Sequence, residues 1–97
     1  MRIARVRGRS MEPTLRDGDR LLVASPRHAA PGRVAVVRLP GDRPTAVKRL
    51  AFRQDAGWWV ERDNPAEGVD SWLLGALPED AVLGVVVARV WPAPRLL

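Results

Sequence analysis

The chain has 97 residues, of which 46% are hydrophobic and 28% are charged, and this composition is typical of a single globular domain spanning 1–97. The absence of cysteine excludes a disulfide scaffold and a thiolate zinc site, and one histidine cannot form a multi-histidine site, so we expect no cofactor. The net charge of +5 fits either a surface for nucleic acid or an arginine-rich solvated surface.

Nine prolines and eight glycines divide the chain into short apolar segments, which predicts strands and disfavours long helices. The expected strands are, in chain order, Ile3–Val6, Leu21–Ala24, Val34–Leu39, Thr45–Phe52, Trp58–Glu61 and Val82–Trp91. Asp17–Asp19 is expected to form a turn and Pro40–Asp42 a hairpin loop. A helical turn is expected only within Leu73–Ala81. We therefore predict an all-β, mainly antiparallel domain with little helix, either a small sandwich or a partly closed barrel.

The first expected strand and its continuation carry arginine at alternate positions. By the two-residue period of a strand, Arg5, Arg7 and Arg9 share one face, and Ala4 and Val6 share the other. This pattern predicts a strand at the edge or surface of the sheet. Its charged outer face disfavours pairing with the edge of another sheet.

Lys48 is the only lysine in a chain that otherwise uses arginine. In the expected strand it shares a face with Ala46, Leu50 and Phe52, so it lies in an apolar row. Burial would lower its pKa from about 10.4, and a neutral amine can act as a general base. The alternative is a lysine whose stem covers the sheet while its ammonium group reaches water, and the alternation alone does not decide between the two.

A neutral lysine can activate a serine hydroxyl, and Ser-Lys pairs are a known form of nucleophilic serine. Two of the three serines, Ser25 and Ser71, stand in contexts typical of turns. Ser10 stands where Gly8 and Pro13 favour a sharp bend. Such a bend can expose the hydroxyl and direct backbone N–H groups toward a developing oxyanion.

Four segments resemble sequence boxes of one peptidase family. Gly8–Asp19 resembles the nucleophile box of the type I signal peptidases and, more loosely, that of self-cleaving LexA-like repressors. Pro31–Val37 resembles the strand that follows, with Arg33 in place of the usual acid, and Ala46–Leu50 resembles the box of the general base. The family's closing box is matched by a further set of residues, which are Asp63, Asn64, Asp70, Ser71, Gly75, Pro78, Leu83 and Gly84. The four boxes stand in the family's order and cover nearly all of 6–88.

The resemblance implies a serine endopeptidase with a signal-peptidase or LexA-like catalytic core, in which Ser10 is the nucleophile and Lys48 the general base. It implies substrate or oxyanion contacts at Gly8, Met11 and Pro13, and supporting roles around the dyad for Asp63, Asn64, Asp70 and Ser71. Two positions depart from the family. Gly68 stands where many relatives have a serine that touches the lysine, and Trp72 stands where they usually have an arginine partner for the aspartate.

Only nine residues precede Ser10, and no segment reaches the ~20 apolar residues of a membrane-spanning helix or the apolar core of a secretory signal. The chain therefore resembles the small peptidases described as nickel-type superoxide dismutase maturation proteases. This resemblance implies a cytoplasmic enzyme that removes an N-terminal extension from a precursor protein bound as an extended peptide. Neither a nucleic-acid partner nor a membrane span is expected.

Three alternatives remain open at this point. A signal peptidase without its own anchor would use Trp58, Trp59 and Trp91 at a membrane surface, although we expect one ring of the Trp pair to lie in the core. A basic module without catalysis would bind nucleic acid, but it leaves the four ordered boxes unexplained. A Ser-His-Asp hydrolase built on His28 is disfavoured, because His28 stands in an expected surface loop.

Overall fold

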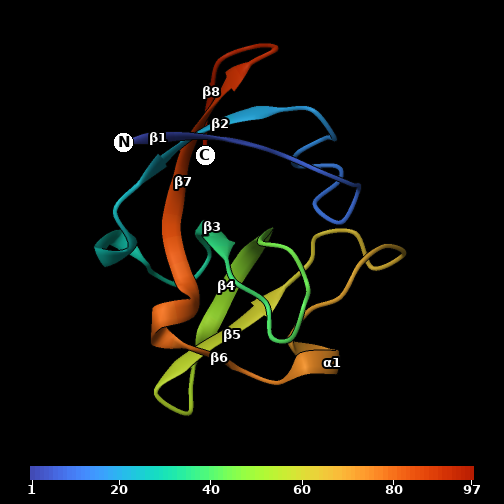
Figure 1. Cartoon of the computed structure of the whole chain (residues 1–97). Helices are drawn as coiled ribbons and strands as arrows, with labels where there is room; N and C mark the ends of the chain where they lie inside the picture. Colours follow the sequence, from blue (N-terminus) through green and yellow to red (C-terminus); the bar gives the residue numbers. More distant parts are fainter.

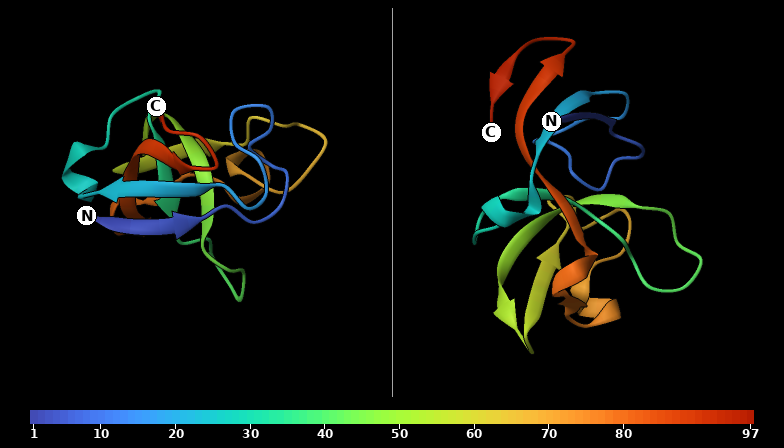
Figure 2. Two further views of the ribbon diagram at one scale, coloured as in Figure 1. Left: turned by 90° about the horizontal axis from the view of Figure 1, so that it is seen from above. Right: turned by 60° about the vertical axis from the view of Figure 1, so that its left-hand side comes forward.

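The computed structural model describes residues 1–97. Its elements are β1 (Arg2–Arg5), β2 (Arg20–Ala24), η1 (Pro26–His28), β3 (Val34–Val37), β4 (Ala46–Gln54), β5 (Gly57–Glu61), α1 (Ser71–Leu74), β6 (Leu77–Pro78), η2 (Glu79–Ala81), β7 (Val82–Trp91) and β8 (Arg95–Leu96). The strands form one antiparallel sheet in the order β1-β2-β7-β3-β4-β5-β6, with β8 paired to β7 (Figure 1). The sheet curls into a half-barrel, which confirms the predicted all-β, mainly antiparallel fold (Figure 2).

Strand β7 joins the two halves of the molecule. It pairs with β2 on one side and with β3 on the other, and Figures 1 and 2 show it running from the β1-β2 half to the β3-β6 half. Gly84 permits the close approach of β2, because a Cβ at this position would overlap the side chain of Val23 and lie 2.9 Å from the carbonyl oxygen of Ala24.

The hydrophobic interior consists of two cores, and the smaller one includes Val34 of β3 as well as residues of the β1-β2 half. The larger core consists of Ala35, Val37, Leu39, Leu50, Trp58, Val60, Leu77, Ala81 and Val82. The smaller core consists of Val6, Met11, Leu15, Leu21, Val23, Val34 and Val86. Met11 and Leu15 are each 1% exposed, so the turn that carries Ser10 is anchored in the smaller core. Lys48 lies in β4, whose Leu50 belongs to the larger core.

The six expected strands are present: Val82–Trp91 has the expected bounds, and the others differ by one or two residues at an end. The β3-β4 hairpin has the expected antiparallel pairing. The predicted helical turn is correct at η2, which lies within Leu73–Ala81, and wrong in that α1 begins before this range and η1 lies outside it. Asp70 caps α1 by accepting a hydrogen bond from the Trp72 N–H (3.1 Å), and Gly75 ends it with a positive φ of 77°. The next residues form β6 against β5, and only η2 is helical after that. No helix in the structure combines the length and the hydrophobicity needed to cross a membrane.

The predicted apolar row of β4 is correct as far as Leu50 and wrong at Phe52. An irregularity in the β4-β5 register between Leu50 and Phe52 changes the alternation, and Phe52 is 45% exposed. Phe52 stacks on the half-buried Trp59, with ring centroids 5.8 Å apart. The neighbouring Trp58 is fully buried, so one ring of the Trp pair lies in the core as expected.

Candidate active site

Ser10 and Lys48 are brought together although 38 positions separate them in the sequence. A hydrogen bond of 3.1 Å joins Lys48 Nζ to Ser10 Oγ. Ser10 lies in the turn that follows β1, and Lys48 is the third residue of β4. The turn supplies the hydroxyl from one half of the molecule, and the strand supplies the amine from the other.

Lys48 is 2% exposed, so the alternative of a lysine that extends its ammonium group into bulk water is wrong. Burial lowers the pKa of Lys48 below its ordinary value. The charge of Asp70 raises this pKa and the charge of Arg62 lowers it, and both effects are smaller than that of burial. The apolar row identified in the sequence accounts for the largest of these effects.

Asp70 is held in place by its neighbours and by Arg62. Its carboxylate accepts hydrogen bonds from the backbone N–H groups of Arg62 and Trp72, each at 3.1 Å. The Arg62 Nε lies 3.9 Å from Asp70 Oδ2. Trp72 contributes its backbone N–H to the Asp70 carboxylate, and the arginine next to this carboxylate is Arg62, the residue after β5. Sequence reasoning missed it because its partner is eight positions away.

Asn64 fixes the backbone of the turn that carries Ser10. Its backbone N–H donates to the carbonyl oxygen of Ser10 (2.8 Å), and its side-chain Nδ2 donates to the carbonyl oxygen of Arg9 (2.9 Å). Its Oδ1 accepts from the N–H of Ala66 (3.1 Å), which orients the amide. Asn64 thus stands next to the dyad, in the region where the sequence placed a supporting residue.

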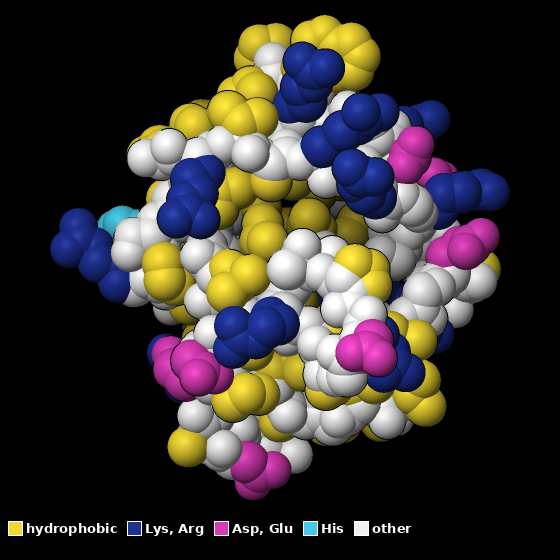
Figure 3. Space-filling view, in the orientation of Figure 1, with side chains coloured by type: hydrophobic (Ala, Val, Ile, Leu, Met, Phe, Trp, Pro, Cys, Tyr) yellow, Lys and Arg dark blue, Asp and Glu magenta, His cyan; other side chains and the backbone are white.

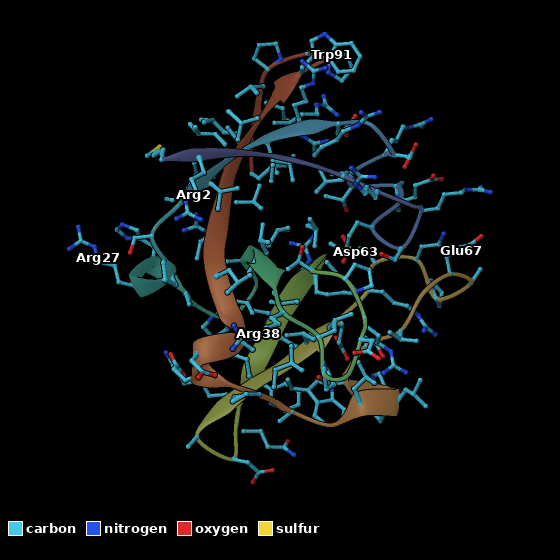
Figure 4. The ribbon with its side chains drawn as sticks, in the orientation of Figure 1. Arg2, Arg27, Arg38, Asp63, Glu67 and Trp91 are labelled. Carbon is cyan, nitrogen blue, oxygen red and sulfur yellow. The ribbon has the colours of Figure 1, made fainter.

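Asp63 connects the Ser10 turn to the strand of Lys48 (Figure 4). It accepts a hydrogen bond from Thr14 Oγ1 (2.6 Å) and two from the Arg49 guanidinium (3.1 and 2.6 Å). Burial would raise the pKa of Asp63, but the hydrogen bonds from Arg49 and Thr14 and the charge of Arg49 outweigh it, so the pKa is lowered. The carboxylate therefore remains ionised between the two elements. Sequence reasoning found Asp63 and missed both of its partners.

Ser71 has a structural position and no contact with the dyad. Ser71 is 1% exposed, and its hydroxyl oxygen accepts a hydrogen bond from the backbone N–H of Val60 (2.8 Å). This bond attaches the start of α1 to β5, which places Asp70 beside the dyad.

Gly68 lies directly against both members of the dyad. A Cβ at this position would lie 2.9 Å from Ser10 Cβ and 3.5 Å from Lys48 Nζ, and the backbone has a positive φ of 81°. Arg62 donates hydrogen bonds to the carbonyl oxygens of Gly68 and Pro65, which hold the loop in this position. The glycine that departs from the family pattern therefore allows the loop to approach the dyad closely.

A groove of about 520 Å³ opens at the dyad. It is lined by 4–11 on one side and by 43–48 and 67–69 on the other. Figure 3 shows a hollow on this face with a hydrophobic floor and basic side chains around its margin. Gly8 and Met11 line the groove, as expected for residues near a substrate, whereas Pro13 does not.

The backbone N–H groups at the turn differ in their availability. The N–H of Gly8 donates to Asp17 Oδ1 (2.7 Å) and is therefore occupied. The N–H groups of Ser10 and Met11 have no hydrogen-bond partner in the protein. These two adjacent donors next to the Ser10 hydroxyl are therefore not occupied by groups of the protein.

His28 is exposed in η1 and does not line the groove, so the structure does not bring it to Ser10. No curated protein matches the chain. A family model described as peptidase S24-like matches 1–87. This match agrees with the looser of the two resemblances in the sequence, that to the LexA-like peptidases. The chain therefore belongs to the peptidase S24-like family of serine peptidases.

Proposed function

We propose that the protein is a serine endopeptidase in which Ser10 is the nucleophile and Lys48 is the general base. The observation that carries this proposal is the 3.1 Å contact between Ser10 Oγ and an Nζ that is almost completely buried. Burial favours the neutral amine, and only the neutral amine can accept the serine proton. The lysine thus has both the position and the environment of a base.

The reaction follows from this geometry. Ser10 Oγ attacks the scissile carbonyl carbon while Lys48 Nζ takes the hydroxyl proton, and the N–H groups of Ser10 and Met11 donate to the resulting oxyanion. Lys48 returns the proton to the leaving nitrogen as the C–N bond breaks, which leaves an ester on Ser10. Water then attacks the ester with Lys48 again as base, and the acid and free Ser10 are released.

The free edge of β1 and its extension is suited to an extended substrate. The N–H and C=O of Val6 bond toward Asp19 and Gly18 (both 2.8 Å), on the side of β2. By the alternation of a strand, Arg5 and Arg7 direct their backbone groups away from β2, and those of Arg7 have no partner in the protein. A peptide can add to this edge as a further strand next to Ser10.

We propose that the substrate is a precursor protein from which an N-terminal extension is removed. An unfolded terminal segment is the part of a protein that most readily presents an extended strand. Small residues (Ala, Gly or Ser) are expected before the scissile bond, with Met11 at the floor of the pocket. Nickel-type superoxide dismutase is the first precursor to examine, because of the resemblance of the sequence to its maturation proteases.

The test is co-expression of the protein with candidate precursors, followed by mass spectrometry of their N-termini. The wild type is expected to shorten one precursor at a single bond. Ser10→Ala and Lys48→Arg are each expected to reduce cleavage about a thousandfold or more, since alanine has no hydroxyl to attack the carbonyl carbon and arginine cannot accept the serine proton. Lys48→Met is the control for folding, because methionine fits an apolar site but cannot act as a base. If Lys48→Met unfolds at or above the wild-type temperature and is nevertheless inactive, the loss of activity reflects the missing base and not misfolding. A Lys48→Arg protein with a tenth or more of the wild-type rate would contradict the role of Lys48.

A further inference from the structure

The groove beside the dyad is lined by far more positive than negative charge. Four arginines line it (Arg5, Arg7, Arg9 and Arg43), against one acidic residue, Glu67. In the whole chain the ratio is 16 basic to 11 acidic residues. The ratio of basic to acidic residues is therefore higher in the groove than in the chain as a whole.

Three of these four arginines have no acidic partner within the protein. Arg9 is neutralised in part by Glu12, with Nε and Oε2 3.2 Å apart. No carboxylate lies within ion-pair distance of Arg5, Arg7 or Arg43, and all three side chains are exposed. Arg43 Nη1 donates a hydrogen bond to the carbonyl oxygen of Pro40 (3.4 Å), which leaves its charge unneutralised. Arg5 and Arg7 stand on the bank formed by β1 and its extension, and Arg43 stands on the opposite bank. Three guanidinium groups without a carboxylate partner thus flank the path of the peptide.

Their position along the chain relates them to the scissile bond. Arg7 precedes Ser10 by three residues, which is about 10 Å of extended chain at most. Since a peptide paired with this edge advances by about 3.3 Å per residue, substrate side chains about three positions from the scissile bond pass Arg7, and those about five positions from it pass Arg5.

We infer that the groove selects substrates with acidic side chains three to five residues from the scissile bond, and that Arg5, Arg7 and Arg43 bind these carboxylates. The inference rests on the proposed peptidase function and adds a class of substrate to it. Guanidinium groups pair with carboxylates through two parallel hydrogen bonds, so the contact depends on the relative orientation of the two groups as well as on their charges. The apolar floor of the groove is left for the small residues at the bond itself.

The experiment uses three labelled 12-residue peptides with the bond of a central Ala-Ala as the scissile bond and Asp, Asn or Lys at the third to fifth positions on both sides of this bond. Binding to the Ser10→Ala protein is measured by fluorescence anisotropy. The Asp peptide is expected to bind roughly tenfold tighter than the Asn peptide, because two to three exposed ion pairs contribute about two- to fivefold each. This preference is expected to weaken as the salt concentration rises from about 0.05 to about 0.5 M, since salt screens exposed charges.

Matched variants separate the groove from the general positive charge of the protein. Arg7→Gln and Arg5→Gln are each expected to weaken binding of the Asp peptide roughly two- to fivefold. Arg27→Gln removes the same charge from η1, which lies on the opposite side of the molecule from the loop of Glu67 (Figure 4), and is expected to leave binding unchanged. Arg7→Glu is expected to reverse the preference in favour of the Lys peptide.

Equal binding of the Asp and Asn peptides, or an equal effect of Arg27→Gln and Arg7→Gln, would overturn the inference. Cleavage by the wild-type protein distinguishes this failure from a failure of the proposed function. If the Asn and Asp peptides are cleaved at equal rates and only when Ser10 is present, the acidic preference is wrong and the peptidase function stands. If the Asp peptide binds as expected but neither it nor any precursor is cleaved, the function is wrong and the groove remains a site for acidic peptides.

Discussion

Lys48 links the chemistry of the site to the pH of the solution. Burial lowers its pKa below 10.5, so the amine becomes neutral, and able to accept the Ser10 proton, at a lower pH than a free lysine. We expect kcat/KM to rise with pH and to level off at a midpoint below 10.5. A rate that continues to rise with unit slope beyond about 10.5 would show that the amine is not desolvated.

The same shift predicts a change in stability, measured by urea unfolding of the wild type and of Lys48→Met. Because the folded pKa is lower than the unfolded one, the unfolded chain binds more protons between the two values. The free energy of unfolding of the wild type should therefore rise relative to that of Lys48→Met as pH increases through this window. A difference that stays constant with pH would contradict the shift.

At the scale of single residues, the sequence predicted that Ser10 and Lys48 form a pair, which the structure brings into contact, and it predicted part of their surroundings. Lys48 was identifiable because it is the only lysine and lies in an apolar row, and Ser10 because it stands at a bend within an ordered set of boxes. Arg62 was not identifiable, because it reaches Asp70 from the end of a neighbouring strand. Alternation along one strand predicts which face a side chain occupies, but it does not predict which side chain from another element arrives there.

Among the elements, the loop between β5 and α1 controls the fit of the site. Gly68 in this loop has a φ of 81° and lies against Ser10 and Lys48. Gly68→Ala is expected to destabilise the protein by about 1–2 kcal/mol through backbone strain, and to lower kcat/KM tenfold or more by displacing the serine. Gly32→Ala is the matched control, since Gly32 has a φ of 87° but its Cβ would meet no atom within 4 Å. Equal losses of kcat/KM in the two variants would contradict a direct effect on the dyad.

The elements themselves were predictable in proportion to their length. The strands with clear apolar runs and turn signals were found, and their ends were displaced by a few residues. The two-residue strands β6 and β8 were not found, because their pairing with β5 and β7 supplies the stabilisation that their sequences do not. The position of α1 depends on the cap at Asp70 and the positive φ at Gly75, and the general composition of Leu73–Ala81 did not reveal either.

In the whole molecule, the pair of Ser10 and Lys48 lies where two hydrophobic cores adjoin. Ser10 is attached to the smaller core through Met11, Leu50 of the Lys48 strand belongs to the larger core, and β7 contributes to both. We expect the distance between Oγ and Nζ to depend in part on how closely β2 packs on β7. Gly84 sets this packing, because any side chain there meets Val23 and Ala24.

Gly84→Ala is expected to destabilise the protein by about 1–3 kcal/mol and to lower kcat/KM of the folded protein, because it separates β2 from β7 and moves the two halves apart. Gly57→Ala is the matched control. A Cβ at Gly57 would overlap the carbonyl group of Leu77, so this variant is also destabilised, but its strain falls at the β5-β6 pair within one half. Thermal unfolding and kcat/KM at a temperature where both variants are folded provide the comparison. We expect both melting temperatures to fall and only Gly84→Ala to lose activity, since only this variant changes the distance across the site. Equal activity of the two variants would show that the halves hold the dyad independently of the β2-β7 packing.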